Sequence, residues 1–242
     1  MLSQRRRKKS QLAKLPLPIA IVVVGIYLIA TVVLGPQEDY EPAEGTALEQ
    51  LETLEVKGRA PKTGYSRDEF GDGWLDPDGN GCDARNDVLA RDLESVVHDA
   101  DGCKVLTGVL QDPFTGQTIE FTRGAQTSMD VQIDHIVALS DAWQKGAQQL
   151  AAEERERLAN DPVNLLAVDG PANAQKSDAD AATWLPQNKD FRCEFVAMQI
   201  AVKAKYDLWV TEPEHDAMTQ VLAECPDESA YTTQDELPLL RQ

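Results

Sequence analysis

Apolar residues form one long run near the N-terminus and, further along the chain, shorter runs with helical or strand spacing. The first run, over residues 15–35, holds no charged side chain and is long enough to cross a bilayer as a helix. Beyond residue 61 the apolar positions recur with periods of about two or about 3.6 residues. The pattern predicts an α+β domain behind an N-terminal transmembrane helix.

Several short segments read as β-strands. Residues 104–110 and 118–122 flank a turn that contains Pro and Gly, which predicts a β-hairpin. Residues 131–139 and 164–168 predict two further strands. A Gly-Pro turn follows the second of these, and a helix is expected to begin around Ala172.

Helical spacing of apolar residues appears in three longer segments. These segments are residues 87–97, 143–158 and 191–209. The last one keeps its phase over about five turns, which favours a long core helix. Thr211 and Glu214 form a capping-box sequence that predicts one more helix after it.

Charge and composition divide the chain into five parts. A basic cytoplasmic tail is expected first, before the apolar run, because basic residues mark the cytoplasmic side of a membrane helix. The folded domain then lies outside, on a single-pass anchor in the lipid bilayer. A cleaved signal peptide, which would give a secreted protein, is the alternative. The predicted parts are the tail (1–14), the anchor or signal segment (15–35), an acidic stalk (36–60), the folded domain (61–226) and a loose tail (227–242).

The four cysteines lack the paired CxxC or CxxH spacing of zinc sites. Outside the cytoplasm, an even number of cysteines predicts disulfide bonds. We prefer the pairs Cys82 with Cys103 and Cys193 with Cys225 among the three possible connectivities, because each pair closes a local loop.

The formal net charge of −18 restricts the functions that fit the chain. Proteins that bind nucleic acid usually carry a basic stripe, so this charge opposes a polyanionic substrate unless a cation is bound. It favours a non-catalytic exported scaffold or binding protein as an alternative. No helix-turn-helix or zinc-finger sequence is present, which argues against a sequence-reading module.

Polar motifs lie in the two strands expected at 131–139 and 164–168 and in the helix after them. Asp134-His135 lies in the first, Asn164 opens the second, and Asn173-x-x-Lys176-x-Asp178 lies in the helix after it. In order and spacing, these motifs closely resemble HNH endonucleases of the ββα-metal superfamily. The sequence looks in particular like the C-terminal HNH domain of GmrSD-type restriction enzymes and the small exported proteins that carry it alone. The resemblance extends from about Gly73 to Cys225 and implies a disulfide-braced ββα-metal core with additional helices and a β-hairpin.

The resemblance implies a role for each central residue. Asp134 and Asn173 would bind one divalent cation, Mg²⁺ or Mn²⁺, through the oxygen ligands that these ions prefer. His135 would be the general base that deprotonates a water, since its ordinary pKa is close to working pH. Asn164 would brace the loop and orient the imidazole through a hydrogen bond.

Further residues are candidates for substrate binding. Lys176 would contact a phosphate, and Asp178 would hold Lys176 or a metal-bound water. Arg85 and Arg123 resemble recurrent features of the exported relatives and could grip phosphate, although structural ion pairs explain them equally well. Ala138 stands where many relatives have Pro, which removes no chemical group.

Asp76, Asp78 and Asn80 reproduce the opening of a calcium-binding loop. Asp87 occupies the twelfth position, where such loops usually carry a bidentate Glu. A Ca²⁺ site is therefore one interpretation, and a polar turn beside Cys82 is the other.

The sequence thus predicts a metal-dependent HNH endonuclease that acts on nucleic acid outside the cytoplasm, with DNA favoured over RNA. No protein partner is predicted. A serine hydrolase that pairs Ser140 or Ser128 with His135 is a weaker alternative, because the GxSxG sequence of a nucleophile elbow is absent. His98 and His215 lie in helix-like contexts without partner motifs, so we assign them no chemistry.

Overall fold

The structure is a computed structural model that describes residues 45–231. The predicted basic tail (1–14) and membrane anchor (15–35) lie outside these residues, as do the first part of the predicted stalk and residues 232–242. Within residues 45–231, no helix has the length and apolar character that a membrane span requires. The anchor therefore stays a prediction from the sequence.

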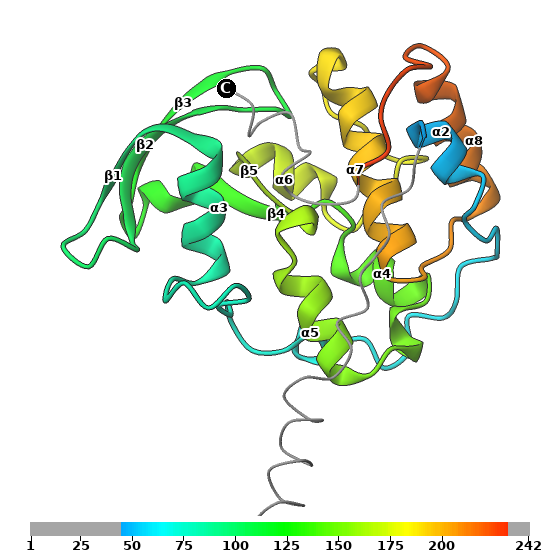
Figure 1. Cartoon of the computed structure of the whole chain (residues 1–242), viewed down its shortest axis with the longest axis horizontal. Coiled ribbons are helices and arrows are strands. Elements are labelled where there is room, and N and C mark those ends of the chain that lie inside the picture. Colours follow the sequence, from blue (N-terminus) through cyan, green and yellow to red (C-terminus); the bar gives the residue numbers. More distant parts are fainter. Residues whose placement is uncertain (1–44, 232–242) are drawn as a thin grey trace, which may run out of the picture. The chain divides into compact units, whose positions relative to one another are not determined.

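The described chain is a mixed α/β domain with two small antiparallel sheets, which agrees with the predicted α+β class (Figure 1). Its helices are α2 (Ala47–Leu51), α3 (Ala84–Asp92), α4 (Leu139–Gln144), α5 (Ala152–Asn160), α6 (Gly170–Lys176), α7 (Arg192–Lys205) and α8 (Glu212–Leu222). Its strands are β1 (Leu93–His98), β2 (Val105–Gln111), β3 (Thr118–Thr122), β4 (Val131–His135) and β5 (Leu165–Asp169). Short 3₁₀ turns are η1 (Arg67–Phe70), η2 (Thr127–Met129), η3 (Ala147–Gln149), η4 (Pro162–Asn164) and η5 (Lys189–Phe191).

The two sheets have different roles. The predicted hairpin forms β2 and β3, and β1 adds a third strand to it. β4 pairs with β5 as a separate two-stranded ribbon, in a register that places His135 opposite Leu165. α6 follows β5 directly, so β4, β5 and α6 have the strand–strand–helix order that the resemblance implied.

The β4–β5 ribbon is packed on both faces. Leu166 and Val168 belong to the larger core, which is built mainly from helices, and Leu165 and Ala167 belong to the smaller core beside α3 and the three-stranded sheet. Successive side chains of a strand point to opposite faces, so burial of both faces explains the continuous apolar run of β5. His135, at the end of β4, is therefore mounted on a frame that is buried on two sides.

The start of α6 is fixed by close backbone contact. A Cβ atom at position 170 would lie 2.0 Å from the carbonyl oxygen of Met129, so only Gly fits without a shift of the backbone. Asp169 caps the helix, because its side chain accepts a hydrogen bond of 2.7 Å from the backbone N–H of Ala172. These contacts determine which side chains of α6 face β4.

Two helices predicted from apolar spacing were wrong in extent. The helix expected over 87–97 stops after α3, and the chain continues as β1, which pairs with β2. Val96 and Val97 are β-branched and favour a strand once a partner strand is available. The helix expected over 143–158 is divided into α4, η3 and α5 near Gly146, whose φ of 127° is incompatible with a helix.

The helices predicted near the C-terminus are present, although α7 ends at Lys205, four residues before the predicted end. α7 lies within the predicted segment 191–209 and buries Phe195, Met198 and Val202 in the larger core. α8 begins after Thr211, which forms the capping box with Glu214.

The folded domain begins before residue 61, where we expected its start. Ala47 and Leu51 of α2 are fully buried in the larger core and pack near α7 and α8. The backbone N–H of Ala47 donates to the carbonyl of Glu228 at 2.8 Å. Residues 45–60 and 227–231, assigned to the stalk and the loose tail, therefore pack on the domain, because the apolar spacing of α2 outweighs the polar composition around it.

A buried ionic cluster joins the helical half of the domain. The Nζ atom of Lys145 lies 2.6 Å from a carboxylate oxygen of Glu214 and 2.7 Å from one of Asp180. The cluster consists of Lys145, Lys203, Asp141, Asp180 and Glu214, with Arg59 at its edge. Three positive and three negative side chains thus balance, as buried charges require. The cluster links α4, α7 and α8 to the segment before η1.

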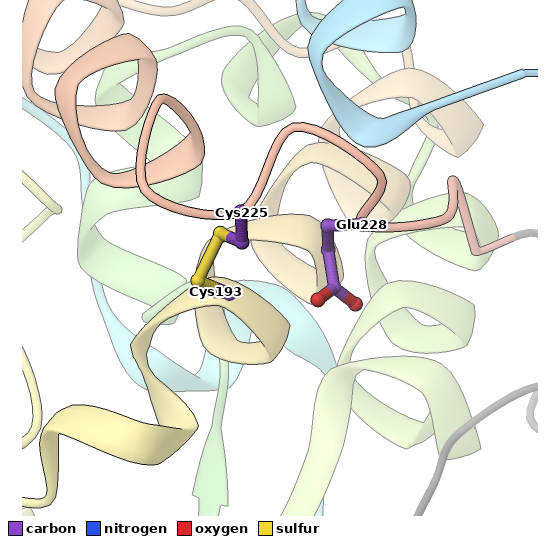
Figure 2. A group of neighbouring side chains, drawn as sticks. All are labelled: Cys193, Cys225 and Glu228. Carbon is purple, nitrogen blue, oxygen red and sulfur yellow. A yellow bond between two sulfur atoms is a disulfide. The ribbon is translucent and has the colours of Figure 1, made fainter.

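The two disulfides pair as the sequence predicted. Cys82 bonds Cys103, and Cys193 at the start of α7 bonds Cys225 just after α8. Figure 2 shows the second bridge with the Glu228 carboxylate beside it. This bridge closes the helical hairpin of α7 and α8, and both helices contact α2.

Leu51→Ala should lower the free energy of unfolding by about 2–5 kcal/mol, because it leaves a cavity between α2 and the larger core. Val56 lies in the same segment but is 50% exposed, so Val56→Ala should change the stability by less than about 0.5 kcal/mol. Urea denaturation of the full-length chain measures both effects. Equal losses would contradict the packing of α2 on the domain.

Glu194→Gln should make the domain more stable at alkaline pH. Burial, and after it the charge of Glu228, raises the pKa of Glu194 from its usual 4.5 to about 7. The folded state therefore holds a proton that the unfolded state releases, and the associated stability, up to about 3 kcal/mol, is present below pH 4.5 and lost as the pH rises through 7. Melting curves from pH 4 to 8 should show a gap between variant and wild type that widens with pH. Glu224→Gln, an exposed change near the same bridge, should show no such gap.

Candidate active site

A cleft of about 430 Å³ lies at the end of β4, where the ribbon meets α4 and α6. Four of the residues predicted for the site line it: Asp134, His135, Asn173 and Asp178. A second cavity of about 140 Å³ lies against the same histidine and shares Arg67, His135 and Leu139 with the cleft. The structure therefore brings the Asp-His motif and the Asn of α6 to one place.

Asp134 is bound by Lys176, which reaches it from the end of α6. The Nζ atom lies 3.0 and 2.9 Å from the two carboxylate oxygens and also donates to the backbone carbonyl of His135 at 2.8 Å. Burial raises the pKa of Asp134, and the Lys176 charge opposes this rise. Lys176 is 1% exposed and does not line the cleft, so an internal ion pair takes the place of the phosphate contact that we expected.

His135 is held in one orientation and one tautomer. Its Nε2 lies 2.9 Å from the carbonyl oxygen of Ala159. Because a carbonyl only accepts, Nε2 carries the proton and Nδ1 keeps a free lone pair. The Trp74 ring stacks on the imidazole, with 6.0 Å between centroids and 9° between planes. Burial lowers the pKa of His135 to about 3, so the ring is neutral at pH 7.

Asn164 is fully buried and binds backbone groups on the two segments that position His135. Its Oδ1 accepts a hydrogen bond of 2.8 Å from the backbone N–H of Val137, and its Nδ2 donates to the carbonyl of Leu158 at 3.1 Å. It therefore braces both the loop after His135 and the residue next to Ala159. The imidazole itself is bonded to Ala159 and not to Asn164, which differs from our expectation.

Asn173 and Asp134 offer oxygen atoms to the cleft. The Nδ2 of Asn173 donates to Gln132 at 3.0 Å, which leaves its carbonyl oxygen available. The Oδ2 of Asp134 is buried and, although 2.9 Å from Lys176, accepts no well-aligned hydrogen bond from the described residues. Oxygen donors of this kind suit Mg²⁺ or Mn²⁺. The residues present thus fit a divalent cation at the end of β4.

A second grouping of possible ligand atoms does not fit a metal. Among residues 45–231, atoms of Cys193, Cys225 and Glu228 lie within 4.8 Å of one another (Figure 2). Both sulfur atoms belong to the disulfide, and metal binding requires free thiolates. This group is therefore structural.

Asp178 lines the cleft with partners other than those we expected. Ser177, with a φ of 52°, ends α6 and separates the inward Lys176 from Asp178. Lys62 and the hydroxyl of Ser140 each donate to the Asp178 carboxylate at 2.9 Å. The hydrogen bond from Lys62, followed by that from Ser140, lowers the pKa of Asp178. The Ser140 hydroxyl thus donates its hydrogen bond to the Asp178 carboxylate and not to His135, so the serine hydrolase alternative gains no support.

One wall of the cleft was not predicted from the sequence. Residues 59–74 contribute Lys62 and Tyr65 to the first cavity, Trp74 to the second and Arg67 to both. These residues have no motif spacing, and they meet His135 only because η1 packs against α4 and α5. The stacking of Trp74 could not have been read from the chain.

Arg85 and Arg123 lie together, away from both cavities. The Arg123 guanidinium donates to the carbonyl of Val105 and to the side chain of Asn86, each at 2.5 Å. Burial, and after it the charge of Arg123, lowers the pKa of Arg85. Arg123 is therefore held by structural hydrogen bonds, whereas phosphate binding by Arg85 stays a prediction.

The segment that resembles a calcium loop is held by its own hydrogen bonds. The backbone N–H of Asn80 donates to Asp76 and Asp78, each at 3.1 Å. Its side-chain amide donates to Asp78 at 3.0 Å and to Asp87 at 3.2 Å. These hydrogen bonds engage the carboxylates of Asp78 and Asp87 within the turn itself, which favours the polar turn.

The remaining histidines and Ser128 line neither cavity. His98 is exposed near the carbonyl of Cys103, and His215 lies 3.7 Å from Glu52. They take no part in the candidate site.

Comparisons with known proteins bear on this site. The sequence model of the family described as GmrSD restriction endonucleases, C-terminal domain, matches residues 83–221, more than half of the chain. A relative from Arthroderma benhamiae, described as an uncharacterized secreted protein, is 35% identical over 206 residues, which is 84% of this chain and 97% of the relative. No solved structure matches the chain significantly. The matched range contains the Asp-His, Asn and Asn motifs, so the resemblance seen in the sequence is confirmed: the chain belongs to the HNH-type family of the GmrSD restriction endonuclease C-terminal domain.

Proposed function

We propose that the protein is a metal-dependent HNH endonuclease that hydrolyses phosphodiester bonds of nucleic acid outside the cytoplasm. DNA is the favoured substrate and RNA the alternative. The hydrogen bond from His135 to Ala159 carries the proposal, because it leaves a neutral imidazole with one acceptor nitrogen. That imidazole lines the same cleft as Asp134 and Asn173.

His135 acts as the general base in this proposal. Its Nδ1 accepts a proton from the attacking water, while its Nε2–H stays bonded to the Ala159 carbonyl, which stabilises the imidazolium that forms. Burial keeps the ring neutral at pH 7, and Trp74 fixes its plane. The same low pKa makes His135 a weaker base than the ordinary histidine expected from the sequence. General-base catalysis of this kind contributes about 10²–10⁴ to a rate.

Asp134 and Asn173 are the residues that would bind the divalent cation. When bound, such a cation neutralises the scissile phosphate and stabilises the leaving oxygen. Lys176 is a positioning residue, because its ammonium fixes the Asp134 carboxylate and the backbone of His135 together.

We infer a location outside the cytoplasm from the disulfides and the relative. Disulfides persist in oxidising compartments, and both pairs are formed here. The Arthroderma benhamiae relative is described as secreted. Insertion of residues 15–35 into the lipid bilayer is part of the proposal, and a fully secreted form is the alternative.

A non-catalytic exported scaffold is the second candidate, and the net charge of −18 favours it. Such a protein would keep the fold and the disulfides but would show no dependence on His135.

The full-length protein in detergent, incubated with plasmid DNA or RNA, should cleave nucleic acid in Mg²⁺ or Mn²⁺ and stop when EDTA is added. His135→Ala should reduce the rate by about 10²-fold or more, because the general base is lost. Gel electrophoresis over a time course measures the rate.

His98→Ala is the matched control, since His98 is exposed and lines neither cavity. It should cleave as the wild type does. A folded wild type that cleaves nothing in either metal, or equal rates for His135→Ala and wild type, would support the scaffold instead.

A further inference from the structure

The segment that walls the cleft lies outside the range matched by the family model. That match begins at residue 83, whereas residues 59–74 line both cavities beside His135. The family comparison therefore assigns no role to this wall.

Arg67 differs from the neighbouring cations Arg59 and Lys62, because no residue within 45–231 binds its guanidinium. Arg59 is paired with Asp141 and Asp180, and Lys62 with Asp178. The Arg67 guanidinium makes no hydrogen bond or ion pair with any described residue. Arg123 and Arg192 also lack an acidic partner, but both donate hydrogen bonds to backbone carbonyls, whereas the Arg67 guanidinium donates none within the described residues.

The position of Arg67 is also specific. Its side chain is exposed, lines the cleft together with Asp134 and Asn173, and lines the second cavity together with Trp74. It is close enough to His135 for the two groups to interact electrostatically. The unpaired charge thus lies on the side of the histidine that faces the cleft.

We propose that Arg67 binds a backbone phosphate of the nucleic acid in the cleft, which makes residues 59–74 the substrate-binding wall of the enzyme. The inference rests on the proposed nuclease function. A guanidinium presents a planar fork of donors that matches a phosphate bidentately. No internal bond has to be broken for Arg67 to do so, in contrast to Lys62 and Lys176, which are held by Asp178 and Asp134.

The acidic charge of the protein makes this contact important. The nucleic-acid backbone is repelled by a net charge of −18, so binding depends on the few cations that face the substrate. Within the described chain, Arg67 is the cation shared by the two cavities. It can therefore hold the strand in the same cleft that Asp134, His135 and Asn173 line.

Binding of a short fluorescein-labelled DNA oligonucleotide, measured by fluorescence anisotropy, tests the inference. The full-length protein carries His135→Ala so that the DNA stays intact, and Mg²⁺ is present. Adding Arg67→Ala should weaken binding about tenfold or more. It should also reduce the magnitude of the negative slope of log K against log salt by roughly one, because one phosphate contact is lost. The affinity of Arg67→Lys should lie between those of the parent protein and Arg67→Ala, since lysine keeps the positive charge but cannot bind a phosphate through two parallel hydrogen bonds.

Arg157→Ala is the matched control, because its side chain is 71% exposed and lines neither cavity. It should leave both the affinity and the salt slope unchanged. If Arg67→Ala binds like Arg157→Ala while the wild type still cleaves DNA, the role of Arg67 is refuted and the nuclease stands. If the wild type neither binds nor cleaves, both proposals fall together.

Discussion

The ion pair between Asp134 and Lys176 is the contact on which the candidate site depends. It joins the end of β4 to the end of α6 inside the protein, where removal of one partner would cost about 3–5 kcal/mol. The same ammonium binds the His135 carbonyl, so one buried cation fixes both members of the Asp-His motif. The register that results also brings Asn173, one helical turn earlier, onto Gln132.

The buried lysines of the described chain neutralise buried carboxylates and so stabilise the fold. Lys145 and Lys203 neutralise the buried acids of the helical half, and Lys176 neutralises Asp134. The proposed phosphate chemistry in such an acidic molecule therefore depends on groups at the cleft itself. Those groups are the oxygen donors that fit a divalent cation and the unpaired guanidinium of Arg67.

Local patterns predicted much of the fold, and long-range contacts account for what was missed. The ribbon, α6, the α8 cap and both disulfides follow from spacing within short segments. The helix expected over 87–97 failed because β2 offers a partner strand that its own sequence does not reveal. Lys176 was expected to contact phosphate. Its ion pair with Asp134 was missed, because the distance between the two residues depends on how α6 packs against β4. The wall over 59–74 was missed for the same reason, because only tertiary packing brings it to His135.

Binding of Mn²⁺, followed by electron paramagnetic resonance, tests most directly whether this cleft is a metal-dependent active site. The account predicts that the full-length protein binds the ion and that Asn173→Ala, a change of a half-buried side chain that spares the Asp134–Lys176 pair, abolishes binding. Asn80→Ala, in the turn that resembles a calcium loop, should bind as the wild type does. Unchanged binding by Asn173→Ala together with a loss in Asn80→Ala would contradict the account and place the metal elsewhere.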